Sequence, residues 1–338
     1  MADEIEIEQK EIEELALKAC RGAGADEASA QALVDATLSA ARFGPATLGF
    51  PHMVDYLNSF REGRINCAPV PTLTRPYPAM LVSDADGGVA QLGFDLAFSD
   101  IVDAARSFGI AMFTQTNSYT AGELGYFVRR LAKVGLVGLA ATNANAMVVS
   151  KPGGPSVFST NPMAFGFPLG ETSLPLIIDQ ASSATAFVNI VAAAAEGRPI
   201  PKGWALDTNG ADTEDPEKAL GGALLPFGGR KGANVALLVE MLSAGLSGGP
   251  WSIDTADFRS GSTRPAVGLT VLAMMPGPPE HGRVARAHAQ TRRLAGLDVY
   301  IPGISKSEFP PSHTKKLMIP AAIYEAIHAF AAGRSHPK

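Results

Sequence analysis

A glycine-rich loop with two adjacent cations stands directly before an apolar segment. It reads GGALLPFGGRKG, residues 221–232, and places Arg230 and Lys231 where a helix would begin. The first turn of a helix exposes unpaired N–H groups and a partial positive charge, so this loop suits an anion such as a dinucleotide phosphate. The fingerprint GxGxxG is absent, and so is the spacing of a phosphate-cradling P-loop. Two interpretations stay open: an anion site of another kind, or a glycine turn with solvated cations.

The segment that follows this loop is periodic. Apolar residues recur at intervals of three and four positions, which predicts a helix over 230–246 with one buried face. That face would consist of Val235, Leu238, Val239, Leu242 and Leu246.

A polar loop, residues 117–120, follows an apolar run at 110–117 that is typical of a strand. Thr120 and Glu123 have the spacing of a capping box and predict a helix over 122–135. Open α/β sheets bind ligands at the carboxyl ends of their strands, where these polar residues would lie. The loop is therefore either a ligand site or only a well-capped helix start.

Two more polar positions lie at the ends of extended segments. In FSTNPMAFGFP the residues Thr160, Asn161 and Pro162 form a turn, and in LIIDQAS the carboxylate of Asp179 closes an apolar strand. Taken alone, the first is simply a turn. The second suits capping of the following helix as well as it suits binding.

The histidines are unevenly distributed. There are six, and His52 is the only one before His281. A metal cluster or a Ser-His-Asp triad would therefore have to draw on His52 or on the C-terminal tail. The motifs HExxH, CxxC and GxSxG are all absent. The sequence predicts no metal site and argues against a metalloenzyme or a serine hydrolase.

The composition is that of an ordinary globular protein. Of 338 residues, 46% are hydrophobic and 18% are charged, with a formal net charge of −5. A negative net charge argues against binding to nucleic acid or anionic lipid. The start, MADEIEIEQKEIEEL, is acidic, unlike a targeting peptide, and no apolar run approaches the roughly 20 residues of a membrane helix. We expect a cytoplasmic protein without nucleic-acid or membrane partners.

Strand and helix patterns alternate along the chain and predict an α/β protein. The alternation begins with a strand at 80–86, a helix at 94–109, the strand at 110–117, the helix at 122–135 and a strand at 136–143. Further strands are expected at 163–168, 174–179 and 269–276, and further helices at 26–42 and 185–196. A Pro/Gly-rich loop at 302–311 precedes a C-terminal helix.

Four of these segments together resemble a known family. NSYTAGELGYF, FSTNPMAFGFP, LIIDQAS and GGALLPFGGRKG, in this order, are similar to the malate/L-lactate dehydrogenase family, which lacks a Rossmann fold. The resemblance runs over roughly residues 10–306 and is strongest to the branch that reduces Δ1-pyrroline-2-carboxylate and Δ1-piperideine-2-carboxylate. It implies a homodimeric NAD(P)H-dependent reductase of a cyclic imino acid. It also implies an α/β fold with an NAD(P)-binding domain at 114–280, the other domain being formed by 1–113 and 281–338.

The resemblance also assigns roles to particular residues. Thr160 falls on the substrate side. The cofactor-binding positions are Asn117, Ser118, Tyr119, Thr120, Asp179, Gln180, Ala181, Arg230, Lys231, Pro302 and Gly303. Gln180 stands where the family has Met. Two adjacent cations suit either a 2′-phosphate or the pyrophosphate; the first interpretation is preferred, so the expected cofactor is NADPH, with NADH possible.

The largest departure from the family lies in RFGPATLGFPH. Thr47 aligns with the family's Ser, Leu48 with its His, and His52 with its Arg. Leucine cannot donate a proton. Reduction of a ketone produces an alkoxide that needs a donor, whereas a cyclic imine can be protonated before hydride transfer. Leu48 therefore favours an imine over a ketone.

Three hypotheses follow for the altered site. In the first, His52 or Tyr119 replaces the missing proton donor or anchors a substrate carboxylate. In the second, the substrate differs and Leu48 shapes its pocket. In the third, catalysis is altered or lost and the cofactor is only bound. The candidate catalytic residues are Thr47, His52 and Tyr119, and the candidate substrate-binding residues are Leu48, His52 and Thr160. Dehydrogenation of a malate- or lactate-like 2-hydroxy acid is the alternative activity, and a non-enzymatic interaction protein that uses the helix faces at 120–135 and 284–293 stays open.

Overall fold

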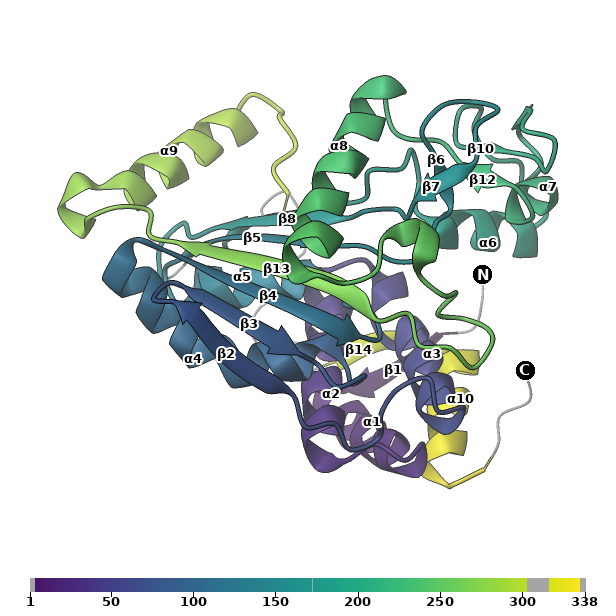
Figure 1. Ribbon diagram of the computed structural model, residues 1–338, viewed down its shortest axis with the longest axis horizontal. Coiled ribbons are helices and arrows are strands. Elements are labelled where there is room, and N and C mark those ends of the chain that lie inside the picture. The colour runs from purple at the N-terminus through teal and green to yellow at the C-terminus, as the bar shows by residue number, and fades with distance from the viewer. Residues whose placement is uncertain (1–3, 172, 303–315, 335–338) are drawn as a thin grey trace.

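The computed structural model describes residues 4–171, 173–302 and 316–334, and a seven-stranded sheet forms its centre (Figure 1). The strand order is β2-β3-β4-β13-β5-β8-β9, and the one parallel pair within this sheet is β3 with β4. The strands are β2 (Thr72–Tyr77), β3 (Met80–Asp84), β4 (Ile110–Ser118), β13 (Val267–Met274), β5 (Val137–Thr142), β8 (Met163–Phe167) and β9 (Leu176–Gln180). The predicted α/β class is confirmed, and each strand expected from the sequence coincides with one of these within a few residues.

Helices cover both faces of this sheet. α4 (Ala90–Phe108) and α5 (Gly125–Lys133) lie below it in Figure 1, and α8 (Arg230–Glu240) lies above it. Under the sheet, the ring of Phe94 packs edge-on against Phe113 at 5.9 Å and against Phe127 at 5.0 Å. These buried rings fix α4 and α5 to the strands whose ends carry the polar loops.

The two ends of the described chain meet in a helical layer. β1 (Glu4–Glu8) pairs antiparallel with β14 (Lys316–Pro320), and α1 (Gln9–Gly22) packs on α10 (Ala321–Ala331). Gly22 allows this approach, because a Cβ there would lie 2.1 Å from the carbonyl oxygen of Phe330. α2 (Glu27–Phe43) and α3 (Phe50–Arg61) complete the layer and bring it against the sheet.

A smaller five-stranded sheet lies beside α8 (Figure 1). Its order is β11-β10-β12-β6-β7. The elements are β6 (Val148–Val149), β7 (Ser156–Phe158), α6 (Phe187–Ala195), β10 (Ala205–Leu206), β11 (Asp212–Thr213), α7 (Pro216–Leu220) and β12 (Ala223–Leu224). β12 is the start of the glycine-rich loop, so this sheet carries the loop to α8.

The helix predicted at 230–246 is present, and its predicted buried face is partly correct. α8 ends at Glu240 and continues as a π turn at Met241–Gly245. Val239 is buried as expected, and Val235 and Leu242 are partly buried. Leu238 and Leu246 are exposed instead, at 52% and 44%, while small residues such as Ala233 and Ala236 are buried.

β4 runs from Ile110 to Ser118, through the expected boundary at residue 113. The expected division of the chain into two domains stays a prediction. The remaining elements are the short helices η1 (Ala46–Leu48), η3 (Ser252–Asp254) and η4 (Pro279–His281), and α9 (Arg283–Ala295). The predicted C-terminal helix is confirmed by α10, whereas most of the loop expected at 302–311 lies outside the described residues.

The described residues contain neither a membrane-spanning helix nor a cluster of metal ligands. None of the helices in this part of the chain has the length and apolar character needed to cross a membrane. Over the same ranges, His, Cys, Asp and Glu form no group of three or more that could hold a metal ion.

Candidate active site

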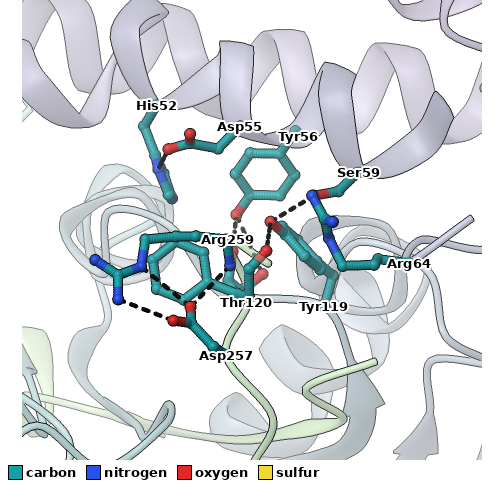
Figure 2. A network of polar contacts seen from close by, with 10 residues as sticks. His52, Asp55, Tyr56, Ser59, Arg64, Tyr119, Thr120, Asp257 and Arg259 are labelled. Carbon is teal, nitrogen blue, oxygen red and sulfur yellow. Dashed lines mark hydrogen bonds and ion pairs between the residues drawn. The ribbon is translucent and has the colours of Figure 1, made fainter. Parts of the chain in front are cut away.

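Side chains of α3 form a polar network with the loop that follows β4 (Figure 2). Thr120 Oγ1 donates to the hydroxyl of Tyr56 at 2.6 Å, and that hydroxyl donates to the Thr120 carbonyl at 3.2 Å. Ser59 Oγ donates to the Tyr119 hydroxyl at 2.7 Å, which in turn donates to the Phe258 carbonyl at 2.9 Å. The loop after β4 is thereby fixed to α3 by its side chains.

This arrangement corrects the predicted capping box. Thr120 bonds Tyr56 rather than the backbone of α5, which begins at Gly125 without a cap from the side chain of its own N-cap residue, Leu124. Glu123 instead forms a buried ion pair with Arg129, whose guanidinium also donates to Ser39 Oγ at 2.6 Å. Tyr56 on α3 and Arg129 on α5 have taken the two side chains that would have formed the local cap.

Both tyrosines of the network hold their protons firmly. Burial raises the pKa of Tyr56 to about 12 and raises the pKa of Tyr119 still further above its usual range. The Tyr119 proton is also engaged by the Phe258 carbonyl. Tyr119 is therefore suited to shaping and stiffening the site.

His52 lies at the open side of this network. Its side chain is 15% exposed, and Nδ1 lies 3.0 Å from Asp55 Oδ2. The His52 ring packs edge-on against Tyr56 and Phe258, with ring centroids 5.1 and 6.2 Å apart. A proton on Nδ1 would be held by Asp55, and among the described residues no hydrogen bond reaches Nε2. The arrangement leaves Nε2 available to a ligand.

Thr47 and Leu48 lie on η1, just before α3. Thr47 is exposed and Leu48 is partly buried. The chain reaches η1 through Gly44, where a Cβ would lie 2.5 Å from the Glu123 carboxylate. Gly49 then packs against Ala41 of α2, at 3.1 Å from a notional Cβ. These close approaches hold η1 next to the end of the loop that carries Thr120.

Three of the predicted cofactor and substrate segments run side by side. Ser182 N donates to the Thr160 carbonyl at 2.7 Å, and Phe227 N donates to the Ser182 carbonyl at 3.1 Å. Ser183 also forms a bridge with Pro226. Main-chain hydrogen bonds thus join the turn at Thr160, the segment after Asp179 and the glycine-rich loop, which are far apart in the sequence.

Asp179 faces a helix other than the one that follows it. Its Oδ2 accepts from Gly125 N at 2.7 Å, so it caps the N-terminus of α5. Burial, with a smaller contribution from Glu123, raises the pKa of the Asp179 carboxyl to about 7. Capping of the following helix, one of the two interpretations from the sequence, is wrong, because the antiparallel β8–β9 pairing carries Asp179 to α5.

The start of α8 retains the features that suit an anion. Gly228 and Gly229 have φ of 56° and 64°, and a Cβ on either would meet no atom within 4 Å. The helix has no side-chain cap, and Arg230 and Lys231 are exposed. Open space, unpaired N–H groups and two cations coincide here, which fits the phosphates of a nicotinamide dinucleotide.

The other predicted cofactor residues occupy varied positions. Asn117 has φ of 58° and donates to Asp84 at 2.8 Å, and Ser118 is buried and donates to the Val267 carbonyl at 3.1 Å. Gln180 is exposed, and Ala181 is partly buried. The Pro302 carbonyl accepts from Ile177 N at 3.5 Å, and Gly303 lies outside the described residues.

Several residues of the network were not found from the sequence. Asp55, Tyr56 and Ser59 follow His52 at helical spacing, so a polar stripe at positions 52–59 was available as a signal. The loop that supplies Phe258 and Arg259 gave no such signal, because it comes from a distant part of the chain. Arg259 forms a bidentate pair with Asp257, at 3.0 and 2.9 Å, and lies 4.6 Å from the ring of Phe187.

Comparison with known proteins shows which family the chain resembles. A family model described as malate/L-lactate dehydrogenase matches residues 7–310. A (2R)-3-sulfolactate dehydrogenase (NADP(+)) of Chromohalobacter salexigens is 31% identical over 330 residues, which cover 97% of this chain and 98% of the relative. A Δ1-pyrroline-2-carboxylate/Δ1-piperideine-2-carboxylate reductase of Pseudomonas aeruginosa is 31% identical over 325 residues, covering 94% and 97%.

Solved structures agree with these sequence relatives. The crystal structure of Δ1-piperideine-2-carboxylate reductase from Pseudomonas syringae pv. tomato superimposes with a TM-score of 0.89 at 31% identity, covering 96% of this chain and 99% of that one. Malate dehydrogenase from Entamoeba histolytica, 22% identical, has the same fold with a TM-score of 0.88 over 99% of both chains. The chain is therefore a nicotinamide-dependent oxidoreductase and belongs to the malate/L-lactate dehydrogenase family.

Proposed function

We propose that this protein uses NADPH to reduce a cyclic imino acid, Δ1-pyrroline-2-carboxylate or Δ1-piperideine-2-carboxylate. The proposal rests on two features together: the start of α8 suits an anion, and position 48 is a leucine. An imine that is already protonated accepts hydride and becomes a neutral amine, so a leucine at the donor position is tolerated. The reductases named among the relatives support this substrate class.

The cofactor would be held mainly by the start of α8. Arg230 and Lys231 supply positive charge for its phosphates, and the exposed N–H groups of the first turn add hydrogen-bond donors. Two adjacent cations favour the extra 2′-phosphate, so NADPH is proposed over NADH. When bound, the nicotinamide supplies the hydride.

On the substrate side, residues of the chain would bind and orient the substrate and exclude water from it. Leu48 and the ring of Phe258 would line the apolar part of the pocket, and Thr160 would offer its hydroxyl to the substrate. As an imidazolium, His52 would donate from Nδ1 to Asp55 and from Nε2 to the substrate carboxylate. Arg259 is less suited to that carboxylate because it is already paired with Asp257.

A second candidate is the dehydrogenation of a 2-hydroxy acid. The His52–Asp55 pair favours it, because a histidine oriented by a carboxylate can exchange a proton with an alcohol. The sulfolactate dehydrogenase among the relatives supports it as well. A cytoplasmic location and the homodimer implied by the family stay predictions.

The deciding experiment measures NADPH and NADH oxidation at 340 nm with both cyclic imines and a panel of 2-oxo acids across pH 5–9. We expect turnover of an imine with NADPH that exceeds turnover of any 2-oxo acid. Replacing Leu48 by His should then raise the rate with 2-oxo acids, because it restores a donor typically worth about 10²–10⁴-fold. Preferred turnover of a 2-oxo acid by the unchanged protein would overturn the imine assignment.

A further inference from the structure

Glu240, the last residue of α8, is a buried carboxylate that the proposed mechanism does not use. It is 4% exposed, and no ion pair of the described residues includes it. Its oxygens are satisfied by neutral donors instead. Oε1 accepts from Ser252 N at 2.6 Å, and Oε2 accepts from Ser252 Oγ and Asn161 Nδ2, both at 2.7 Å. A buried charge is tolerated only with such a complete set of partners.

The Asn161 end of this network belongs to the turn that presents Thr160. Asn161 has φ of 37°, in the left-handed region that a non-glycine residue adopts only when its surroundings hold it there. Its Nδ2 also donates to the Ala236 carbonyl at 2.7 Å, and its Oδ1 accepts from Ser159 Oγ at 2.6 Å. Ser182 Oγ donates to the Asn161 carbonyl, also at 2.7 Å. The turn is therefore fixed to α8 on one side and to the segment after Asp179 on the other.

Glu240 also marks a change in the helix. The π turn that follows it, Met241–Gly245, packs on β13, and Thr270 Oγ1 of that strand donates to the Leu242 carbonyl at 2.5 Å. π turns within helices are frequently found at functional sites. After this turn the chain reaches Ser252, which bonds the same carboxylate as Asn161.

We propose that Glu240 is a positioning residue, which sets the Thr160 turn against α8 and so couples the cofactor-side helix to the substrate side of the site. The inference rests on the proposed function insofar as Thr160 contacts the substrate. Glu240 touches neither ligand and acts through Asn161. Its charge matters because only a carboxylate offers acceptors in both directions.

The test is Glu240→Gln. The amide of glutamine must turn its NH₂ group either toward Ser252 N–H or toward the Asn161 donor, so one hydrogen bond is lost in either orientation. The matched control is Glu14→Gln, which makes the same change on an exposed carboxylate of α1. Both variants are made with and without Trp204→Phe, so that Trp251, next to Ser252, reports alone by fluorescence.

We expect folded Glu240→Gln to lower kcat/KM for the preferred substrate by about 10- to 100-fold, mainly through KM, because a hydrogen bond to a charged group is lost. The Kd for NADPH should stay within about twofold, since the start of α8 is untouched. The emission of Trp251 should move in Glu240→Gln and stay unchanged in Glu14→Gln.

An unchanged kcat/KM in folded Glu240→Gln would overturn the inference, and so would a rise in the Kd for NADPH as large as the rise in KM. If the variant does not fold, Ser252→Ala removes one donor and keeps the other, and a KM unchanged from the parent protein then counts against the proposal. The parent protein is assayed in parallel with imines and 2-oxo acids. Its preference tests the proposed function separately, because the comparison of variants uses whichever substrate the parent reduces.

Discussion

The cofactor side and the hydride-acceptor side of this site are held together by different kinds of contact. On the cofactor side, main-chain hydrogen bonds join Ser182 to Phe227 and to the Thr160 turn of the substrate side. On the acceptor side, the side chains of Tyr56, Ser59 and Tyr119 hold α3 to the loop after β4. The first arrangement rests mainly on main-chain hydrogen bonds, with side-chain contacts of Asn161 added at the turn, and the second depends on residue identity.

This difference explains where the chain departs from its family pattern. On the cofactor side, Gln180 in place of Met changes an exposed side chain and leaves the main-chain pairing of β9 intact. On the acceptor side, His52 pairs with Asp55 and packs on Phe258, and Tyr119 bonds Ser59, so a substitution there changes side-chain contacts directly.

The largest expected effect concerns Asp179, the buried acid of the cofactor side. Its raised pKa means that the folded protein binds a proton that the unfolded chain releases from about pH 4 upward. This contribution to stability is complete below the unfolded pKa and is lost as pH rises through about 7. Asp179→Asn keeps an acceptor for Gly125 N and should remove this dependence, worth at most about 1.4 kcal/mol per pH unit.

The measurement is urea unfolding of the protein and of Asp179→Asn at pH 5, 6, 7 and 8. The variant should gain stability relative to the parent as pH rises, with the difference levelling off above pH 7. Asp254→Asn, a change at an exposed carboxylate, serves as the control. A stability difference that is independent of pH would show that the Asp179 carboxyl is already ionised at the lowest pH used.

The second prediction concerns the two cations at the start of α8. The double change Arg230→Ala with Lys231→Ala should raise the Kd for NADPH by about a hundredfold, since each charge-assisted contact to a phosphate contributes about 1–2 kcal/mol. The Kd for NADH should rise less, because NADH has no 2′-phosphate. Binding is followed by nicotinamide fluorescence, with Lys202→Ala as an exposed-lysine control.

Two outcomes would change the interpretation of this loop. An equal loss for NADH and NADPH would move both cations to the pyrophosphate. An unchanged Kd for both cofactors would leave a glycine turn with solvated cations.

Much of the fold was predictable because it follows from local pattern. Alternating apolar runs located β4, β5 and α5, and the order of four motifs indicated the family. The buried face of α8 was predictable only in part. Val239 is buried as its spacing indicates, but Leu238 and Leu246, which satisfy the same helical period, are exposed, and Ala233 and Ala236 are buried. Periodicity shows that a helix has a buried face but not how far that face extends around it.

In the site, too, residues marked by a local pattern were predictable and their distant partners were not. Arg230, Lys231 and Asp179 were found because they stand next to recognisable loops or strand ends. The partners that give these residues and their neighbours their environment come from elsewhere in the chain. Gly125 N reaches Asp179 across the sheet, and the Phe258 carbonyl reaches Tyr119 from a loop 139 positions away. No local spacing encodes such contacts.

The third prediction separates the possible roles of His52 on the acceptor side. His52→Ala should lower kcat/KM for a cyclic imine by about tenfold, mainly through KM, if the imidazole only meets the substrate carboxylate. If it donates the proton, reduction of 2-oxo acids should fall by about 10²–10⁴-fold, and the pH profile of kcat should lose one limb. His281→Ala, at an exposed site, is the control. Changes below about twofold for both substrate classes would remove His52 from the mechanism.

The smallest effect on turnover is expected at Tyr119, which contributes through packing and its two hydrogen bonds. Tyr119→Phe removes the acceptor of Ser59 and the donor to the Phe258 carbonyl, so the free energy of unfolding should fall by about 1–2 kcal/mol. Because the phenol proton is held by burial and by that carbonyl, kcat/KM for the imine should stay within about threefold. Urea unfolding and NADPH oxidation are measured together, with Tyr77→Phe on exposed β2 as the control. The opposite pattern, a hundredfold loss of turnover at unchanged stability, would make Tyr119 the proton donor and would place the chemistry within the side-chain network itself.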